Sequence, residues 1–256
     1  MNDMAAEADD NTLIITMPVH GIWITPNTPG SKVPSHGTSD FGESYAIDFV
    51  MLNDAKGIKK PYRSSVLKYL ISGVRLSDFY GWGQTVHSPI NGKVLAIEND
   101  IAERQIVNPF TDLRYVRKAT REYLSSRRSP EKIAGNYVLL KISSSEYALL
   151  AHLVKGSIMV KPGESVESGQ VIGKLGHSGN STMPHLHMQF MNRDDFNTAQ
   201  GIPFMIRDYE VFRDGKWFQL DLTNEKVKKG EFARPDDYIE VPQKNILERL
   251  VPKKRG

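Results

Sequence analysis

The chain has 256 residues, enough for one large domain or two small ones with a buried core. Hydrophobic residues at 39% and charged residues at 25% exclude disordered, collagen-like and coiled-coil proteins. A formal net charge of +3 is too small to make nucleic acid the default partner. Because the chain contains no cysteine, any metal site must be built from His, Asp and Glu.

The first ten residues are acidic and polar, without the basic start and apolar stretch of a secretory signal. No run approaches the roughly 18 apolar residues that a membrane span requires. We therefore expect no transmembrane segment, and the sequence as given shows no export signal; whether a leader was removed stays open. The localisation and the oligomeric state stay open.

Short apolar and β-branched runs separated by Gly-, Pro- and Ser-containing turns are typical of an all-β sandwich or barrel. We predict strands within residues 13–24, 45–51, 93–98, 137–143, 147–153, 157–160, 170–175 and 184–191. Residues 25–43 are predicted to be a loop. A hairpin is predicted at 209–220 around Asp214-Gly215, followed by a frayed polar tail that ends at Gly256.

Two segments interrupt this strand pattern and are read as insertions. Residues 53–83 suggest an elaborated loop, and residues 112–129 suggest a helical or partly flexible segment rich in Arg and Lys. No aromatic stacking pattern accompanies these basic residues, so they predict a solvated face rather than a nucleic-acid site.

The string His185-Leu186-His187 lies in a predicted strand. Residues i and i+2 of a strand project from the same face, about 6–7 Å apart, so both imidazoles meet one cavity. One can bind a metal while the other exchanges protons beside it. A pair of ordinary surface histidines explains this short motif equally well.

Two further residues interrupt apolar runs. His152, considered alone, is more often a hydrogen-bonded core residue. Asp48 lies between apolar neighbours and must be paired, hydrogen-bonded or metal-bound if it is buried and ionised. Together with the His-x-His pair they supply a His/Asp zinc site with an open coordination position, the arrangement of catalytic zinc.

Several motifs in this order resemble the lysostaphin-type (LytM-like) zinc endopeptidases of bacterial cell walls. They are Gly135–Leu140, Leu150-Ala151-His152-Leu153, Val160–Val166, Gly169–Gly173, Gly176-His177-Ser178-Gly179-Asn180-Ser181 and Pro184-His185-Leu186-His187. The resemblance covers about residues 45–191, with insertions near 53–83 and 100–133. It implies a mainly β fold with an antiparallel sheet core of the duplicated-hybrid-motif type, helical or loop insertions and a C-terminal β extension.

The resemblance also suggests a domain plan. Residues 1–35 would form a leader and first strands, 36–200 the LytM-like metallopeptidase domain, and 201–256 a hairpin extension and polar tail. It further implies an extracellular or cell-wall location.

By motif position, the resemblance assigns zinc binding to Asp48 and His187, and catalysis to His152 and His185. The family usually has a histidine four residues before the aspartate, where this chain has Ser44, a poor zinc ligand. We predict that His36, twelve residues before Asp48 on the 25–43 loop, supplies the missing ligand.

Three functional hypotheses follow. The first is a Zn2+-dependent endopeptidase that cleaves peptidoglycan cross-links or other small-residue peptides, without nucleic acid as a partner. The second, motivated by Ser44, is a catalytically degenerate module that binds cell wall or a partner protein. The third, a carrier module, rests only on the rhythm of residues 166–173. His177 is expected to be exposed, and His20 and His87 to be structural or surface residues.

Overall fold

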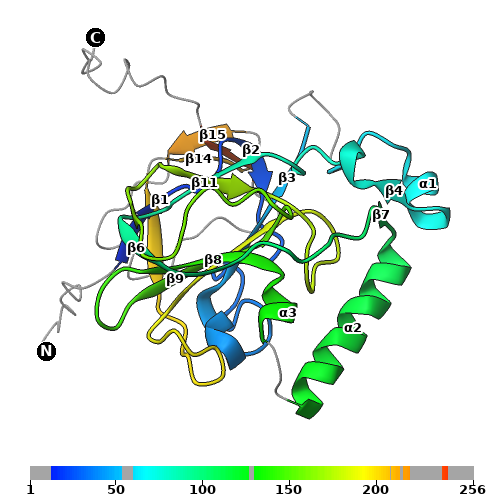
Figure 1. Cartoon of the computed structure of the whole chain (residues 1–256). Helices are drawn as coiled ribbons and strands as arrows, with labels where there is room; N and C mark the ends of the chain where they lie inside the picture. Colours follow the sequence, from blue (N-terminus) through cyan, green and yellow to red (C-terminus); the bar gives the residue numbers. More distant parts are fainter. Residues whose placement is uncertain are drawn as a thin grey trace, which may run out of the picture.

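The computed structural model describes residues 13–53, 60–126, 130–207, 209–213, 216–219 and 238–241. Its main sheet has the strand order β10-β6-β8-β9-β12-β3-β2-β16-β14-β15, and each neighbouring pair in it is antiparallel (Figure 1). The predicted leader and polar tail lie outside the described residues. The mainly β fold predicted from the sequence is confirmed.

The strands of the main sheet are β10 (Ser165–Val166), β6 (Gly92–Glu98), β8 (Asn136–Lys141), β9 (Tyr147–Leu153), β12 (Leu186–Met191), β3 (Ile47–Met51), β2 (Gly21–Ile24), β16 (Tyr238–Val241), β14 (Glu210–Arg213) and β15 (Lys216–Gln219). Smaller two-stranded sheets pair β1 (Leu13–Thr16) with β13 (Phe204–Arg207) and β11 (Val171–Lys174) with β5 (Thr85–His87).

The strand predicted at residues 157–160 is wrong. These residues follow β9 as irregular backbone, tied to β11 by the bond from Met159 N–H to the Ile172 carbonyl. Gly156 and Pro162 bracket the run, and proline has no N–H to donate to a ladder.

The central strands are buried on both faces, which explains why their sequences read as apolar runs rather than alternating patterns. On β9, Ala148 and Leu150 belong to the main core, whereas Leu149 and Ala151 belong to a second cluster on the opposite face. Met191 of β12 joins that second cluster. Because strand side chains alternate, His187 shares the face of Met191. We call this outer surface of β9, β12 and β3 the site face.

Segments from both ends of the described chain join the sheets. β1 pairs in parallel with β13, and β2 lies between β3 and β16. The predicted hairpin is present, since β14 and β15 are antiparallel neighbours. The division at residues 35 and 200 stays a prediction.

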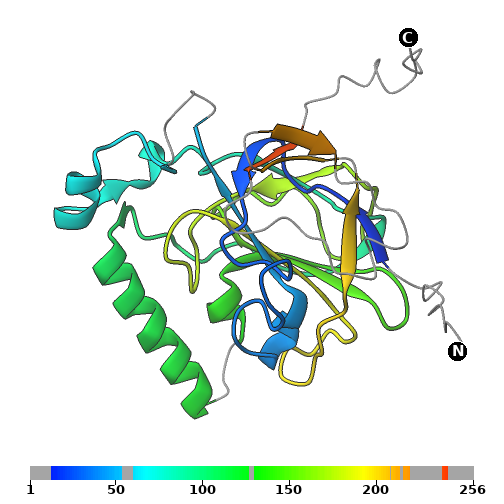
Figure 2. The same ribbon diagram turned by 180° about the vertical axis from the view of Figure 1, so that it is seen from behind.

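A helical lobe, residues 60–83 and 104–126, stands to one side of the sheets in both views (Figures 1 and 2). It contains α1 (Val66–Ile71), the β4 (Val74–Arg75) and β7 (Ile106–Val107) pair, and α2 (Pro109–Ser126). The short helices η1 (Asp40–Tyr45), η2 (Leu76–Asp78) and α3 (Pro130–Ala134) complete the described elements. None of the helices in these residues has the length and apolar character needed to cross a membrane.

Local sequence signals explain where the lobe helices begin. Ser65 caps α1 by accepting a hydrogen bond from the N–H of Lys68, and Asn108 accepts from the N–H groups of Phe110 and Thr111 at the start of α2. Pro109 occupies the first position of α2, where its missing N–H costs nothing. Six buried residues give the lobe a small core of its own: Tyr62, Tyr69, Val74, Leu76, Phe79 and Val107. The predicted insertions thus form one packed unit.

Candidate metal and catalytic site

Strand register brings the predicted site residues together. β12 pairs with β3 so that His187 lies opposite Asp48, and with β9 so that His187 lies opposite Ala151, the neighbour of His152. His36 arrives from the loop that precedes η1. All five predicted residues therefore meet on the site face.

His36, Asp48 and His187 form a compact group whose candidate ligand atoms all lie within 4.8 Å of one another. Asp48 is buried; its Oδ1 lies 2.9 Å from His187 Nδ1 and its Oδ2 lies 3.0 Å from His36 Nε2. Two imidazole nitrogens and a carboxylate are a typical zinc ligand set that leaves a coordination position open. The residues present therefore fit a zinc ion.

Ser44 is not among these three residues and contributes through its backbone. Its carbonyl accepts a hydrogen bond from the Ser35 N–H at 3.0 Å, and the Ser35 hydroxyl lies 3.0 Å from His36 Nδ1. The Ser44 backbone thus anchors the loop that carries His36.

The electrostatics of the three residues suit cation binding. Burial opposes ionisation of Asp48, but the charges of His185 and His36 and hydrogen bonds from His187 and His36 hold its pKa well below the usual value. Burial also acts to lower the pKa of His187, yet the hydrogen bond and charge of Asp48 raise it to about 9. Asp48 therefore keeps a negative charge, which attracts a cation.

Outer partners fix the orientation of the ligand side chains. His187 Nε2 lies 2.8 Å from Gln189 Oε1, and the Gln189 amide donates to the Phe41 carbonyl at 2.7 Å. The Asn27 amide donates to Asp48 Oδ2 at 2.7 Å. A second nitrogen held by an outer acceptor is typical of metal-binding histidines, since it leaves the first nitrogen free for the metal.

His152 and His185 lie next to the candidate ligands, with ring centroids 4.7 Å apart. His152 Nδ1 faces the Ser178 carbonyl at 2.9 Å, and His185 Nδ1 faces the Met183 carbonyl at 2.8 Å. A carbonyl only accepts hydrogen bonds, so we assign the ring hydrogen of each histidine to Nδ1 and a lone pair to Nε2.

These two lone pairs are available as bases on the site face. His185 Nε2 lies 3.6 Å from Asp48 Oδ1. Burial, followed by the neighbouring charge of His185, holds the pKa of His152 well below its usual value. Burial also lowers the pKa of His185. The structure therefore places two neutral imidazoles beside a group of residues that could hold a metal ion.

The expected exposure of His177 is wrong. Its side chain is fully buried because Asp112, Arg104 and Ser181 enclose it, and two of these come from the helical lobe. His20 and His87 pack edge to face at 4.7 Å between ring centroids, consistent with a structural role.

Sequence reasoning missed several residues around the site. Gln189 follows the His-x-His pair at the next same-face position, so strand alternation alone identifies it as a neighbour of His187. No sequence pattern identified Glu43. Burial is the main cause of the raised pKa of Glu43, and the charges of His187 and His36 act to lower it. Its position depends on the folding of η1 against β12.

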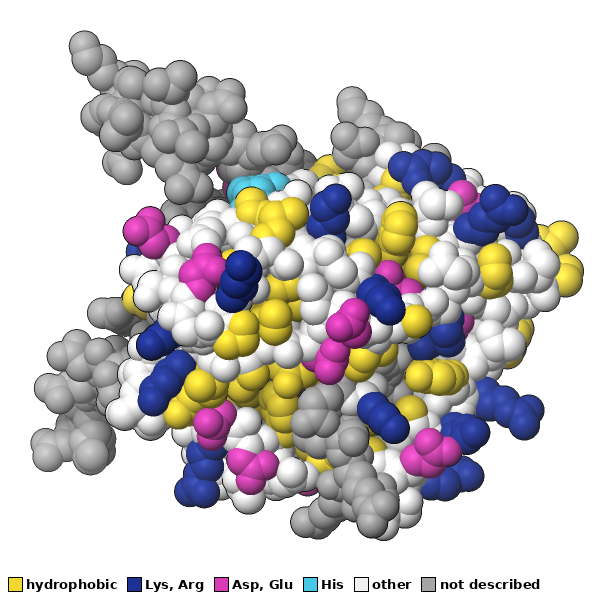
Figure 3. Space-filling view, in the orientation of Figure 1, with side chains coloured by type: hydrophobic (Ala, Val, Ile, Leu, Met, Phe, Trp, Pro, Cys, Tyr) yellow, Lys and Arg dark blue, Asp and Glu magenta, His cyan; other side chains and the backbone are white. Residues whose placement is uncertain are grey.

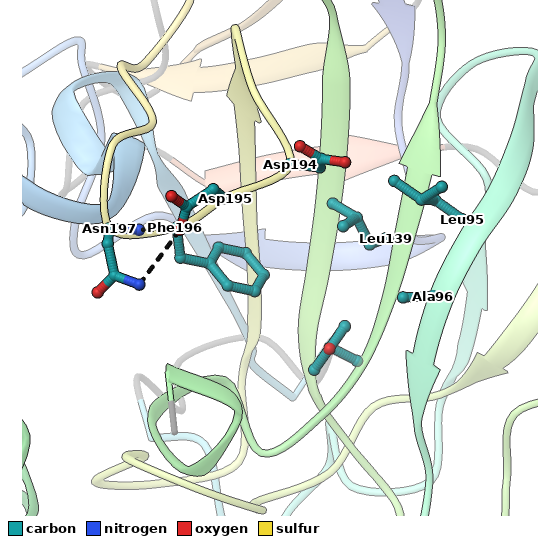
Figure 4. Close-up of a pocket in the computed structure, with 8 residues that line it drawn as sticks. Leu95, Ala96, Leu139, Asp194, Asp195, Phe196 and Asn197 are labelled. Atoms are coloured by element: carbon teal, nitrogen blue, oxygen red, sulfur yellow. Dashed lines mark hydrogen bonds between the residues drawn. The ribbon is translucent and has the colours of Figure 1, made fainter. Parts of the chain in front are cut away.

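A surface hollow elsewhere on the same sheet is separate from this site. It is lined by Leu95, Ala96, Tyr137, Leu139 and the loop after β12 with Asp194, Asp195, Phe196 and Asn197 (Figure 4). None of the five predicted site residues lines it.

Relatives match a part of this chain. The 65 residues aligned with peptidoglycan DD-endopeptidase ShyC of Vibrio cholerae are 40% identical and cover 25% of this chain and 14% of the relative. For peptidoglycan DD-endopeptidase ShyA of the same organism, the identity is 42% over 60 residues, 23% of this chain and 14% of the relative. The matched part thus spans about a seventh of each relative.

Solved structures give weaker overall likenesses. A zinc-containing peptidase from Vibrio cholerae aligns at 23% identity with a TM-score of 0.31, over 56% of this chain and 33% of the other. The catalytic domain of lysostaphin from Staphylococcus simulans aligns at 20% identity with a TM-score of 0.32, over 62% of this chain and 77% of the other.

The model of Peptidase family M23 matches residues 122–199. This range contains His152, His185 and His187, whereas His36, Asp48 and nearly all of the helical lobe lie before it. Over residues 122–199 the chain is thus similar to Peptidase family M23, in agreement with the resemblance seen in its motifs.

Proposed function

We propose that this chain is a zinc-dependent endopeptidase that hydrolyses peptide bonds in peptidoglycan cross-links or stem peptides. The observation that carries the proposal is the convergence of His36, Asp48 and His187 beside two imidazoles that present unprotonated Nε2 atoms. The family match and the activity named for the Vibrio relatives support a peptidase acting on peptidoglycan. Such a substrate implies a location at the cell wall.

In this proposal His36, Asp48 and His187 hold one zinc ion. Zinc bound there supplies Lewis-acid chemistry, polarising a carbonyl group and making water more acidic. Asp48 contributes the negative charge, and the partners Gln189 and Asn27 keep the ligand side chains in place.

His152 and His185 are assigned the proton transfers. A neutral imidazole whose Nε2 faces the site accepts the proton of the attacking water and returns it to the leaving amine. Once protonated, it donates a hydrogen bond to the negative oxygen that develops on the scissile carbonyl. The carbonyls of Ser178 and Met183 accept from the Nδ1–H groups, which leaves Nε2 as the reacting nitrogen.

The test is zinc content together with peptide-bond hydrolysis. We expect about one zinc per purified chain, release of new amino termini from peptidoglycan peptides, loss of this activity with a chelator and its return with zinc. His187→Ala abolishes both zinc retention and activity, whereas His87→Gln, a histidine outside the site, preserves both.

Two outcomes contradict the proposal. Full activity in a metal-free preparation excludes the zinc mechanism. Purification without stoichiometric zinc, combined with inactivity after zinc is added, supports the degenerate binding module that Ser44 suggests.

A further inference from the structure

His177 is fully buried, yet it is neither a candidate zinc ligand nor one of the two histidines assigned to catalysis. Its Nε2 lies 3.0 Å from Arg104 Nη2 and 3.2 Å from Asp112 Oδ1, and its Nδ1 lies 2.9 Å from Ser181 Oγ. Ser181 Oγ in turn lies 3.1 Å from His185 Nδ1. A continuous chain of contacts therefore joins the helical lobe to His185.

The donors and acceptors along this series of contacts determine the direction of each hydrogen bond. A carbonyl only accepts, so the Ser181 hydroxyl gives its hydrogen to the Met183 carbonyl, and His177 Nδ1 must carry the ring hydrogen. His177 Nε2 then accepts from Arg104 Nη2, while Asp112 Oδ1, which only accepts, takes its hydrogen bond from Arg104 Nε. His177 Nδ1–H then donates to Ser181 Oγ, and the Ser181 hydroxyl donates onward to the Met183 carbonyl at 2.6 Å. Burial lowers the pKa of His177, consistent with this neutral form.

The direction matters because Ser181 has two possible recipients for its hydrogen. When that hydrogen points to the Met183 carbonyl, the Ser181 oxygen accepts from His185 Nδ1–H and His185 keeps its lone pair on Nε2. When the Ser181 hydrogen points to His185 Nδ1, the ring proton of His185 moves to Nε2. The second arrangement removes the base from the site face.

The lobe holds His177 from two sides. Asp112 of α2 binds Arg104 Nε at 2.6 Å and also accepts from the Asn108 N–H at 2.7 Å, which fixes it at the start of the helix. Arg104 donates to the carbonyls of Gly179 and Ser181 in the motif loop, residues 176–181. Met183, whose carbonyl faces His185, packs against the lobe core.

We propose that His177 is a positioning residue that, held by Arg104 and Asp112, sets the direction of the Ser181 hydroxyl and thereby keeps His185 in the tautomer with a free Nε2. The proposal deepens the proposed function and rests on the catalytic role given there to His185. It also gives the lobe, which precedes nearly all of the matched family segment, a part in the chemistry.

The kinetic test compares two substitutions of one side chain. His177→Leu fills the space but donates nothing to Ser181, so kcat falls between about tenfold and a thousandfold while KM stays within about twofold; a wrong tautomer costs up to about 10⁴-fold in other enzymes. His177→Asn retains an N–H that can reach Ser181 and keeps kcat within about threefold of wild type. Both variants retain wild-type zinc content.

A spectroscopic test separates this proposal from the proposed function. Nitrogen NMR of ¹⁵N-histidine-labelled protein distinguishes the two tautomers, whether or not the protein hydrolyses any peptide. We expect His185 of the wild type and of His177→Asn to carry its hydrogen on Nδ1, and His185 of His177→Leu to shift toward Nε2. His87→Leu, which removes a half-buried histidine away from the site, serves as the matched control with unchanged His185 signals.

Two outcomes overturn the proposal. Either His185 keeps the Nδ1–H tautomer in His177→Leu, or the leucine variant loses thermal stability with wild-type kcat and KM. An inactive wild type with the expected tautomer change contradicts only the proposed function.

Discussion

The site face buries polar side chains, whereas the helical lobe exposes hydrophobic ones. On the site face, His152, His185 and His187 are buried, and each imidazole has a hydrogen-bond partner in Ser178, Met183, Asp48 or Gln189. The lobe instead exposes most of the large hydrophobic side chains that are exposed in the described residues: Val66, Leu67, Leu70, Ile71, Ile106, Phe110, Leu113 and Tyr115.

The outer surface of the lobe also carries charged side chains. Lys and Arg side chains gather with hydrophobic ones on the side of the molecule where α1 and α2 lie (Figure 3). The inner side of the lobe is nevertheless polar and tightly bonded, through Arg104 and Asp112. The difference indicates that the lobe contributes to the site through a few buried contacts of Arg104 and Asp112. The side chains on its outer surface take no part in these contacts. Substitutions on the two surfaces should therefore differ sharply.

Replacing a ligand on the site face should have the largest effect. His36→Ala is expected to lower zinc affinity by more than about a hundredfold, beyond the 10–100-fold typical of losing an outer partner. Ser44→Ala should change zinc affinity by less than about threefold, because the Ser44 contact on the His36 loop is made by its backbone carbonyl. Competition with a chelator of known affinity measures both. Equal losses in the two variants would remove His36 from the ligand set.

Removing the outer partner of a ligand should have a smaller effect on the same measurement. Gln189→Leu leaves His187 Nε2 without its acceptor and is expected to lower zinc affinity about 10–100-fold. Gln84→Leu, at an exposed glutamine outside the site, is the matched control and should leave affinity unchanged. Wild-type affinity in Gln189→Leu would show that Gln189 does not hold His187.

The motif loop should be sensitive through its backbone. Gly179 has a φ of 66°, and a Cβ there would meet the backbone of Gly135 and Ile133. Gly179→Ala should therefore lower the free energy of unfolding by about 3 kcal/mol, combining an unfavourable φ with a clash. Gly156→Ala has a similar φ of 71° but open space, and should cost about 1 kcal/mol. Urea unfolding measures both, and equal costs would contradict the close packing.

The buried histidines should make the metal-free protein less stable in mild acid. Folded-state pKa values of His152, His177 and His185 lie below the usual value near 6.5, so the unfolded chain binds protons first as pH falls. The contribution of these three histidines to the free energy of unfolding is lost as the pH drops below about 6.5. His187 contributes to stability in the opposite sense. Its raised pKa stabilises the fold below about pH 6.5, and this contribution is lost as the pH rises through about 9.

Denaturant unfolding between pH 7 and pH 5 checks this prediction. The free energy of unfolding should fall over this interval, and His177→Leu should reduce the slope because one of the three histidines is gone. A profile that is flat or rises toward pH 5 would contradict the burial of these groups in neutral form.

The outer surface of the lobe should be the most tolerant. Leu67→Glu and Ile71→Glu place charges on side chains that are 67% and 73% exposed, so unfolding free energies should change by no more than about 0.5 kcal/mol. Peptide hydrolysis should stay at the wild-type rate. Reduced hydrolysis of a soluble peptide by either variant would show that the outer surface of the lobe also acts on the site.

The site was predictable where one strand or one motif carries the information. Alternation predicts that His185 and His187 share a face, and it extends to Gln189. Asp48 stands out because a carboxylate in an apolar run needs a partner. His36 was found through the chemistry of a missing ligand, and the structure brings it to Asp48 across a turn of twelve residues.

Features that depend on distant segments were not predictable in this way. The burial of His177 requires Arg104 and Asp112, more than sixty residues earlier, and the local Gly- and Ser-rich sequence suggests exposure instead. The parallel pairing of β1 with β13 joins opposite ends of the described chain. Nothing in residues 13–16 alone specifies such a partner, because short apolar strands pair with many others.

One backbone detail separates the needs of the fold from those of the chemistry. His152, the next-to-last residue of β9, has a φ of 63°, a left-handed conformation that is costly for most side chains and easy for glycine. A sequence chosen only for compatibility with this backbone would favour glycine at position 152. Glycine would make the end of β9 more stable but would remove the imidazole base. Stability screens or automated redesign of this protein would therefore drift toward inactive variants unless position 152 is held fixed.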